Sequence, residues 1–335
     1  MSRAKGVLLA ASLLAAACGR DAPASAPAST SAPDPAAGRV AAYVDVTLPG
    51  VADLPDPAPR LALVLSFVTA GPDGCTPAWG GRLPLDDPAV LALAGRWRAA
   101  GHELRVALGG QRGTELARSC RDAGRLVAAY RRVVDVLAPA ALDLDVEGPA
   151  LGDRTSVHRR NLALREVQAD ADRRGQAVHV TFTLPADASG LTAAGRALIR
   201  DAHETGVVLD GVNAMTMNYG SVPDDAAGRA MTVAASVHGV LRELQPGADP
   251  AALWRRVWVT PMIGRNDVAP EVFTTADADR LAALARAQGL GGVAFWSLAR
   301  DRPCTAGTGD VASICSGVDA PPGAFATALG RFLGH

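Results

Sequence analysis

Residues 142–147 read Leu-Asp-Leu-Asp-Val-Glu, a strict alternation of apolar and acidic residues. Side chains of a β-strand point alternately to its two faces, so Asp143, Asp145 and Glu147 share one face. The other face is apolar and fits a protein core. Three ionised carboxylates on a buried face would repel one another and lose their hydration, so we expect at least one to hold a proton near neutral pH.

The acidic strand is one of eight apolar runs along the chain. Mostly continuous apolar runs are typical of parallel strands that are covered on both faces. They span Val40–Leu48, Leu61–Val68, Leu104–Leu108, Ala141–Val146, Val178–Leu184, Val212–Met217, Val257–Ile263 and Gly292–Leu298.

Amphipathic stretches follow most of these runs. We expect helices at Pro88–Ala100, Glu115–Leu137, Val157–Arg173, Thr192–Thr205, Ala234–Glu243, Ala276–Gln288 and Ala324–Leu333. Strands and helices in this alternation predict an α/β fold, a (β/α)8 TIM barrel that forms a single catalytic domain over residues 38–335. Active sites of such barrels lie at the C-terminal ends of the strands.

The N-terminal residues 1–18 have the pattern of a signal peptide. Arg3 and Lys5 precede an apolar run that is too short for a membrane-spanning helix. Small residues before Cys18 resemble a lipobox, which predicts lipidation of Cys18; ordinary cleavage near the same alanines is the alternative. Residues 19–37 are rich in Ala, Pro and Ser, so we expect a disordered tether. The protein is therefore expected to be exported, as a cell-envelope lipoprotein or a secreted protein, with membrane contact only through a lipid anchor.

Four further cysteines agree with export, because an even number in an exported domain indicates disulfides. Cys304 and Cys315 lie close together in one loop, so we pair them, which leaves Cys75 with Cys120. The net charge of −1 and the lack of a basic run make nucleic acid an unsuitable partner. We expect a monomer without metal or cofactor.

The acidic strand also limits the chemistry. Residues two apart in a strand have Cα atoms about 6.5–7 Å apart, so these carboxyls cannot flank a sugar from opposite sides as a nucleophile and an acid do. Glu147, the outermost, is suited to act as a general acid. The 2-acetamido group of the substrate is then the natural nucleophile. A solvated edge strand and a divalent-metal site are the alternatives, but a closed barrel has no edge strand.

The chain resembles glycoside hydrolase family 18, the chitinase family, in its short, insertion-free bacterial form. Asp143, Asp145 and Glu147 match the last three acids of the family's Asp-x-x-Asp-x-Asp-x-Glu motif. The likeness covers about residues 39–334 and includes Gly74–Gly81, Leu108–Gly110, Met215–Gly220, Thr260–Asp267 and Phe295–Ser297.

The resemblance implies substrate-assisted retaining hydrolysis. Glu147 would protonate the glycosidic oxygen, Asp145 would orient the N-acetyl group of the −1 sugar and Asp143 would share a proton with Asp145. The chain departs from the family pattern at Ala140, which replaces the first motif acid, and at Ala107, which replaces a serine.

Other candidates for substrate contact lie at the predicted strand ends. Trp296 would form the apolar floor under the −1 sugar, because aromatic faces stack on sugar C–H surfaces. Where the family often has Met-x-Tyr-Asp, this chain has Met217 and Asn218 in the last two places. The remaining candidates are Tyr43, Asp45, Trp79, Met215, Tyr219 and Asp267.

The sequence therefore predicts an endo-acting chitinase that binds chitin or chito-oligosaccharides and hydrolyses β-1,4 linkages between N-acetylglucosamine units. An endo-β-N-acetylglucosaminidase acting on glycans is one alternative. A catalytically weak chito-oligosaccharide-binding surface protein is another, and the alanines at positions 107 and 140 keep it open.

Overall fold

The computed structural model describes Met1 and residues 38–54, 56–221, 225–305 and 311–334. The predicted signal peptide, the lipidation site Cys18 and the predicted tether lie outside the described residues.

Eight parallel strands close into a barrel, as predicted. Around the barrel their order is β1, β13, β10, β9, β7, β6, β5 and β2, and β2 pairs with β1 to complete the ring. These strands are β1 Arg39–Asp45, β2 Leu61–Ala70, β5 Leu104–Gly109, β6 Leu142–Asp145, β7 Val180–Asp187, β9 Gly211–Met215, β10 Val257–Thr260 and β13 Gly292–Phe295. Parallel pairing places the C-terminal ends of all eight at one end of the barrel.

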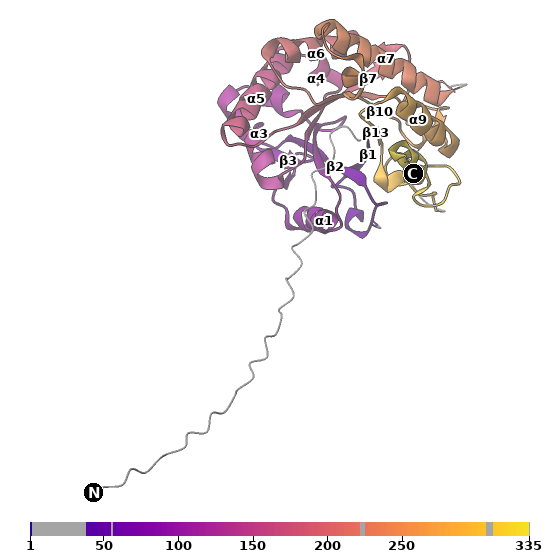
Figure 1. The fold of residues 1–335 in the computed structure, drawn as a ribbon, viewed down its shortest axis with the longest axis horizontal. Helices are drawn as coiled ribbons and strands as arrows, with labels where there is room; N and C mark the ends of the chain where they lie inside the picture. The colour runs from indigo at the N-terminus through magenta and orange to yellow at the C-terminus, as the bar shows by residue number, and fades with distance from the viewer. Residues whose placement is uncertain (2–37, 55, 222–224, 306–310, 335) are drawn as a thin grey trace. The chain divides into compact units, whose positions relative to one another are not determined.

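The main helices lie outside the strands (Figure 1). They are α1 Pro88–Ala99, α3 Ala123–Leu137, α5 Arg154–Arg173, α6 Ala193–Thr205, α7 Ala226–Leu244, α9 Thr275–Gln288 and α11 Ala324–Gly330. None of the helices that the structure describes is long and apolar enough to span a bilayer.

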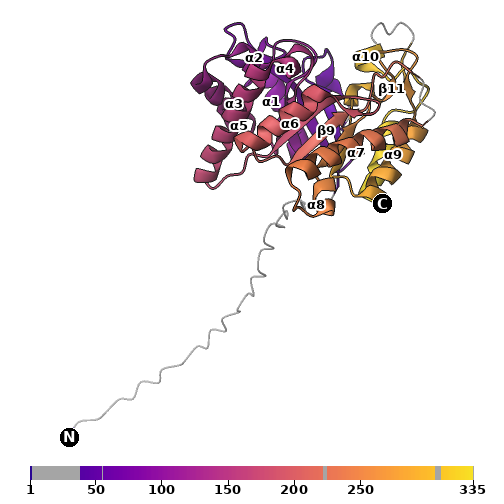
Figure 2. The same ribbon diagram turned by 90° about the horizontal axis from the view of Figure 1, so that it is seen from above.

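Short elements decorate the two ends of the barrel. Figure 2 shows α2 (Leu116–Ser119), α4 (Gly148–Gly152), α10 (Val311–Ile314) and β11 (Gly264–Arg265) at one end and α8 (Pro250–Trp254) at the other. The first group mostly follows barrel strands and so marks the C-terminal ends. The remaining short elements are β3 Pro77–Trp79, β4 Leu83–Pro84, β8 Gly190–Leu191, β12 Val272–Phe273 and the 3-10 turns Val51–Asp53, Leu298–Arg300 and Arg331–Leu333.

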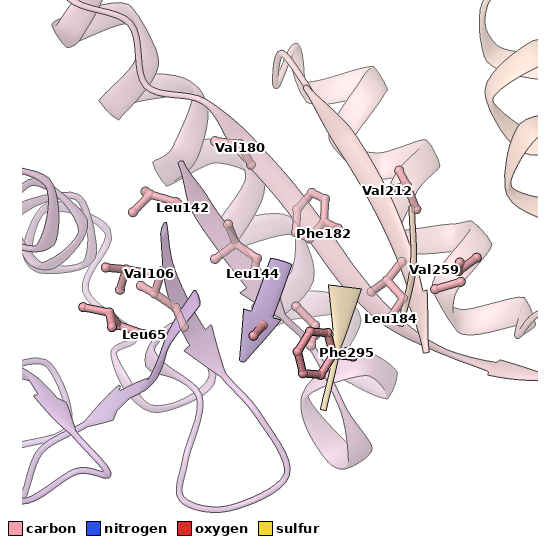
Figure 3. Packing of buried hydrophobic residues seen from close by; sticks show 14 of the residues in the cluster. Leu65, Val106, Leu142, Leu144, Val180, Phe182, Leu184, Val212, Val259 and Phe295 are labelled. Atoms are coloured by element: carbon pink, nitrogen blue, oxygen red, sulfur yellow. The ribbon is translucent and has the colours of Figure 1, made fainter. Parts of the chain in front are cut away.

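Two sets of side chains fill the two faces of the barrel wall. Outward-facing residues such as Leu144, Phe182 and Phe295 pack against the helices (Figure 3). The inward set is built mainly from small residues, with Tyr43 and Trp258 as its large members. The guanidinium of Arg105 lies 4.7 Å from the centre of the Trp258 ring. Small interior side chains leave room for the acids of β6.

Two of the predicted helices differ most from the structure. The helix expected at Glu115–Leu137 is split into α2 and α3, because Cys120 has an extended backbone and Asp122 caps a new helix by accepting from Arg125 N–H. The helix expected at Ala234–Glu243 begins earlier, at Ala226, where Asp225 caps it by accepting from Gly228 N–H. In both cases an aspartate cap fixes the residue at which the helix begins, and the spacing of apolar residues does not reveal that residue.

Both predicted disulfides are present. Cys75–Cys120 ties the loop after β2 to the break between α2 and α3, and Cys304–Cys315 closes a loop after β13.

Candidate active site

Asp143 lies in the barrel interior and accepts hydrogen bonds at both carboxylate oxygens. Tyr43 on β1 donates its phenol proton to Oδ2 at 2.6 Å, and Thr183 on β7 donates to Oδ1 at 2.6 Å. Hydrogen bonds to an ionised carboxylate are short and strong. The hydroxyl that position 107 lacks is thus matched by two hydroxyls from other strands.

Asp145 and Glu147 form a hydrogen-bonded pair nearer the mouth of the barrel. Asp145 is the last residue of β6, and Glu147 keeps an extended backbone as the residue before α4. The Oδ1 atom of Asp145 is buried and has no hydrogen-bond partner among the described residues. All three acids point to one side of the strand, as the alternation predicts.

Burial raises the pKa of all three carboxyls. For Asp145 burial acts first, then the charges of Glu147 and Asp143, and its pKa lies well above the ordinary value. Burial also raises the pKa of Glu147. For Asp143 burial again dominates, while the hydroxyls of Thr183 and Tyr43 and the charge of Arg105 lower its pKa in part. The arrangement therefore favours a proton shared between Asp145 and Glu147.

Two glycines at the end of β5 allow this packing. Gly109 has φ +107°, and a Cβ there would lie 2.0 Å from the Asp145 carbonyl oxygen. Gly110 has φ +82°, and its Cβ would lie 2.8 Å from the Phe67 ring. No side chain fits at either position without moving β6 or the ring of Phe67.

A cleft of about 640 Å³ opens above the acids at the C-terminal ends of the strands. Asp145 and Glu147 line it, and Asp143 lies beneath. The predicted residues that also line the cleft are Tyr43, Asp45, Met215, Met217, Asn218, Asp267 and Trp296.

An aromatic floor lies beside the acids. The rings of Trp296 and Phe67 stack with centroids 5.7 Å apart and planes 22° apart. The Tyr43 ring is 6.2 Å from Trp296 and 6.4 Å from Phe67. Trp296 is half-buried and faces the cleft, so an apolar sugar face can stack on it.

Two asparagines join the loops that follow β9 and β10. Asn266 Oδ1 accepts from Asn218 N–H at 3.1 Å, and Asn218 Oδ1 accepts from Asp267 N–H at 3.0 Å. The side-chain oxygen of Asn218 therefore holds the loop after β10, and the side-chain Nδ2 of Asn218 is the group suited to donate to a ligand. Asp45 lines the cleft but accepts from the backbone and hydroxyl of Thr47.

Two predicted substrate residues do not reach the cleft. Trp79 is fully buried on β3, where its ring N–H points at the Leu85 carbonyl, so its assignment to an outer subsite is wrong. Tyr219 follows Asn218, whose φ of +62° turns the chain away. The Tyr219 ring packs under the Arg229 guanidinium, outside the residues that line the cleft.

Sequence reasoning missed several residues of the site. Phe67 and Met262 line the cleft, and Thr183, Asn213 and Thr260 belong to the hydrogen-bond network behind Asp143. Their inward direction follows from alternation along each strand, but their meeting depends on the register between strands. Among the described residues no group of three or more His, Cys, Asp or Glu side chains is arranged to hold a metal ion.

Comparisons with known proteins place the chain among chitinases. No protein-family model matches it. The chain is 36% identical over 276 residues to a probable bifunctional chitinase/lysozyme of Escherichia coli, covering 78% of this chain and 31% of that protein. It is 35% identical over 277 residues to endochitinase 11 of Metarhizium anisopliae, covering 78% of this chain and 52% of that one. The chain thus spans about a third and about half of these two relatives.

A solved structure covers nearly the whole barrel. The catalytic domain of a hyperthermophilic chitinase from Pyrococcus furiosus superposes with a TM-score of 0.78 at 30% identity, over 90% of this chain and 99% of that one. A second structure, of catalytic-site mutants of that chitinase's active domain 2, contains chito-oligosaccharides and gives a TM-score of 0.77 at 30% identity, over 90% and 97% of the two chains. The chain belongs to glycoside hydrolase family 18.

Proposed function

We propose that this protein is an exported, endo-acting chitinase that cleaves β-1,4 linkages between N-acetylglucosamine units by substrate-assisted retaining catalysis. One observation carries the mechanism. Asp145 lines the cleft beside Glu147, and its buried oxygen Oδ1 has no hydrogen-bond partner among the described residues. The Asp145 carboxyl therefore has acceptor capacity left for the N–H of a 2-acetamido group.

The distribution of carboxyls supports the same mechanism. Besides Asp145 and Glu147, the acids that line the cleft are Asp45 and Asp267. Asp45 is held by Thr47, and Asp267 lies exposed on a loop. Neither is a buried nucleophile facing Glu147, so the acetamido carbonyl is the group left to attack the anomeric carbon, as in glycosidases that use substrate assistance.

In the proposed reaction Glu147 donates its proton to the glycosidic oxygen while the acetamido carbonyl attacks the anomeric carbon. Asp145 holds the acetamido N–H and stabilises the positive charge that develops on the resulting oxazolinium ring. The aromatic floor of Trp296 and Phe67 holds the sugar at this position. Water then gives a proton to the ionised Glu147 and opens the oxazolinium on the face that the leaving sugar vacated, so the β configuration is retained and Glu147 is protonated again.

The endo mode of cleavage rests on the loops around the cleft. Between β10 and β13 the chain forms only the two-residue strands β11 and β12 and the helix α9. No domain inserted there covers the cleft, which suits binding in the middle of a polymer. The disulfides agree with export, and we propose lipidation of Cys18 as the membrane anchor of a monomeric enzyme.

Hydrolysis of a soluble, fully N-acetylated chitohexaose tests the proposal. The purified chain should release products that are initially β-anomers, detected by NMR. Glu147→Gln should lower kcat by about 10²–10⁴-fold, the usual range for a general acid, while oligosaccharide binding persists in calorimetry. Glu204→Gln, which alters an exposed acid on α6, is the matched control and should leave kcat unchanged.

Other outcomes would favour the alternatives. Binding without cleavage would indicate a sugar-binding surface protein. Release of glycans from an N-glycoprotein, with chitohexaose left intact, would indicate an endo-β-N-acetylglucosaminidase. Full activity of Glu147→Gln would overturn the assignment of the acid.

A further inference from the structure

A hydrogen-bond network crosses the barrel interior behind Asp143. Besides donating to Asp143, the hydroxyls of Tyr43 and Thr183 lie 2.9 Å from each other. The amide Nδ2 of Asn213 on β9 donates to both hydroxyl oxygens, at 3.2 Å to Tyr43 and 3.0 Å to Thr183. Thr260 on β10 donates to Asn213 Oδ1 at 2.8 Å. Side chains from five strands thus form one network, of which Tyr43 and Thr183 contact the carboxylate of Asp143.

The hydroxyl pair has two ways to place its protons. Each hydroxyl carries a single proton and can accept as well as donate. At 2.9 Å, Tyr43 and Thr183 can bond to each other, and one of them would then cease to donate to Asp143. Because Asn213 turns its amide N–H toward both oxygens, neither hydroxyl can donate to it, and the carboxylate of Asp143 is the strongest acceptor within reach of both protons. Thr260 selects this orientation of the amide by donating to its carbonyl end.

We propose that Asn213, oriented by Thr260, is a positioning residue that directs the protons of Tyr43 and Thr183 onto Asp143 and so confines the mobile proton of the acidic strand to Asp145 and Glu147. This role of Asn213 rests on the proposed function, because it matters only if Glu147 delivers a proton to the glycosidic oxygen. On β5 the register partner of Asp143 is Ala107, which has no hydroxyl. The hydroxyl donors of Asp143 therefore come from Tyr43 and Thr183, the two residues that Asn213 contacts.

Few charged or titratable groups face Asp143. Asp145 lies on the same strand, Tyr43 faces it from β1, and Arg105 on β5 acts on it from below through its charge. Arg105 is itself paired with Glu103. The groups that β7, β9 and β10 contribute to the network are uncharged. Thr260→Val therefore alters hydrogen bonding at Asp143 without changing a charge, whereas Asn213→Asp also introduces a carboxyl.

The shape-preserving change Thr260→Val removes the hydroxyl that orients the amide. Asn213→Asp keeps the shape but replaces the donor with an acceptor, which draws the hydroxyl protons away from Asp143. In both variants Asp143 should take up a proton at higher pH than in the parent. The acid limb of the kcat profile should then move up by about one pH unit, because hydrogen bonds to a charged group contribute on that scale. Thr260→Ser restores the hydroxyl and should restore the profile.

A second measurement does not depend on activity. Titration of the aspartate carboxyl carbons by NMR, in protein labelled with ¹³C-aspartate, follows Asp143 directly. Its midpoint should lie about one pH unit higher in Thr260→Val than in the parent and in Thr260→Ser. This titration keeps the inference testable if the parent chain fails to hydrolyse chito-oligosaccharides, a result that would count against the proposed function alone.

The alternative is a purely structural role for the network. It predicts that Thr260→Val and Asn213→Asp lower the melting temperature and scale kcat equally at every pH, with the Asp143 midpoint unchanged. That combination would overturn the proposal. A shifted Asp143 midpoint that Thr260→Ser reverses would support it, whether or not Asn213→Asp folds.

Discussion

Removing the phenol oxygen of Tyr43 is the most direct perturbation of the acidic strand. Tyr43→Phe keeps the ring and its contacts with Trp296 and Phe67, which lie 6.2 and 6.4 Å away. It deletes the 2.6 Å hydrogen bond to Asp143 Oδ2 and leaves Thr183 as the remaining hydroxyl donor. The variant therefore isolates one charge-assisted bond in a buried site.

The size of the effect follows from that bond. A hydrogen bond to a charged group contributes about 1.5–3 kcal/mol, and one pH unit corresponds to 1.36 kcal/mol. Since the bond stabilises the ionised carboxylate, its loss should raise the pKa of Asp143 by about one to two pH units. The acid limb of the kcat profile should move up by the same amount, because protonated Asp143 no longer raises the proton affinity of its neighbour Asp145.

Stability should change in the same direction with pH. The bond is present where native Asp143 is ionised, so Tyr43→Phe should cost about 1.5–3 kcal/mol at pH 8 and much less at low pH, where Asp143 is protonated. Chitohexaose hydrolysis and urea unfolding across the pH range measure both effects. Tyr130→Phe, the same change at a buried tyrosine on α3, is the control and should leave the acid limb in place. An unmoved acid limb in Tyr43→Phe, with an equal stability loss at all pH values, would refute the reasoning.

Two further predictions concern stability. Burial and then the charges of its two acidic neighbours raise the pKa of Asp145, so its contribution to stability is full below the ordinary value of 3.8 and is lost as the pH rises through the folded pKa. Asp145→Asn should therefore match the parent in urea unfolding at pH 3 and be the more stable protein at pH 8, although it loses activity. The disulfides Cys75–Cys120 and Cys304–Cys315 close loops of 45 and 11 residues. Replacing each pair by alanine should therefore lower the free energy of unfolding by about 4 and about 3 kcal/mol, respectively. A larger loss for the shorter loop would contradict the loop-entropy account.

Much of the fold and the centre of the site could be predicted from the sequence because both follow from local periodicity. The alternation at residues 142–147 places three acids on one face whatever the rest of the chain does. Continuous apolar runs predict buried parallel strands, and the order of strands and helices then predicts the barrel. Both disulfides followed from the spacing of the four cysteines in a domain that the sequence predicts to be exported.

The rest of the site depends on relations between distant strands. Trp79 is one of few aromatic residues, and the sequence therefore predicts that it contacts the substrate. It lies on β3, which pairs antiparallel with β2 and buries it. Thr183, Asn213 and Thr260 are ordinary strand residues in sequence. They meet because the register pairs Thr183 with Asp145 on β6 and with Asn213 on β9, and sets Thr260 on β10 opposite Met215, two residues beyond Asn213. No local pattern specifies that register.

The departures from the family motif bear on catalysis less than the sequence indicates. The hydroxyl missing at Ala107 would have served Asp143, yet both oxygens of Asp143 already accept from Tyr43 and Thr183. Each oxygen of Asp143 thus has a hydroxyl donor without any contribution from position 107. The raised pKa values of Asp145 and Glu147 favour a proton on this pair, where a general acid needs it. The barrel thus keeps the proton at the mouth of the cleft by taking hydroxyls from opposite walls, which argues for a working hydrolase rather than a protein that only binds sugar.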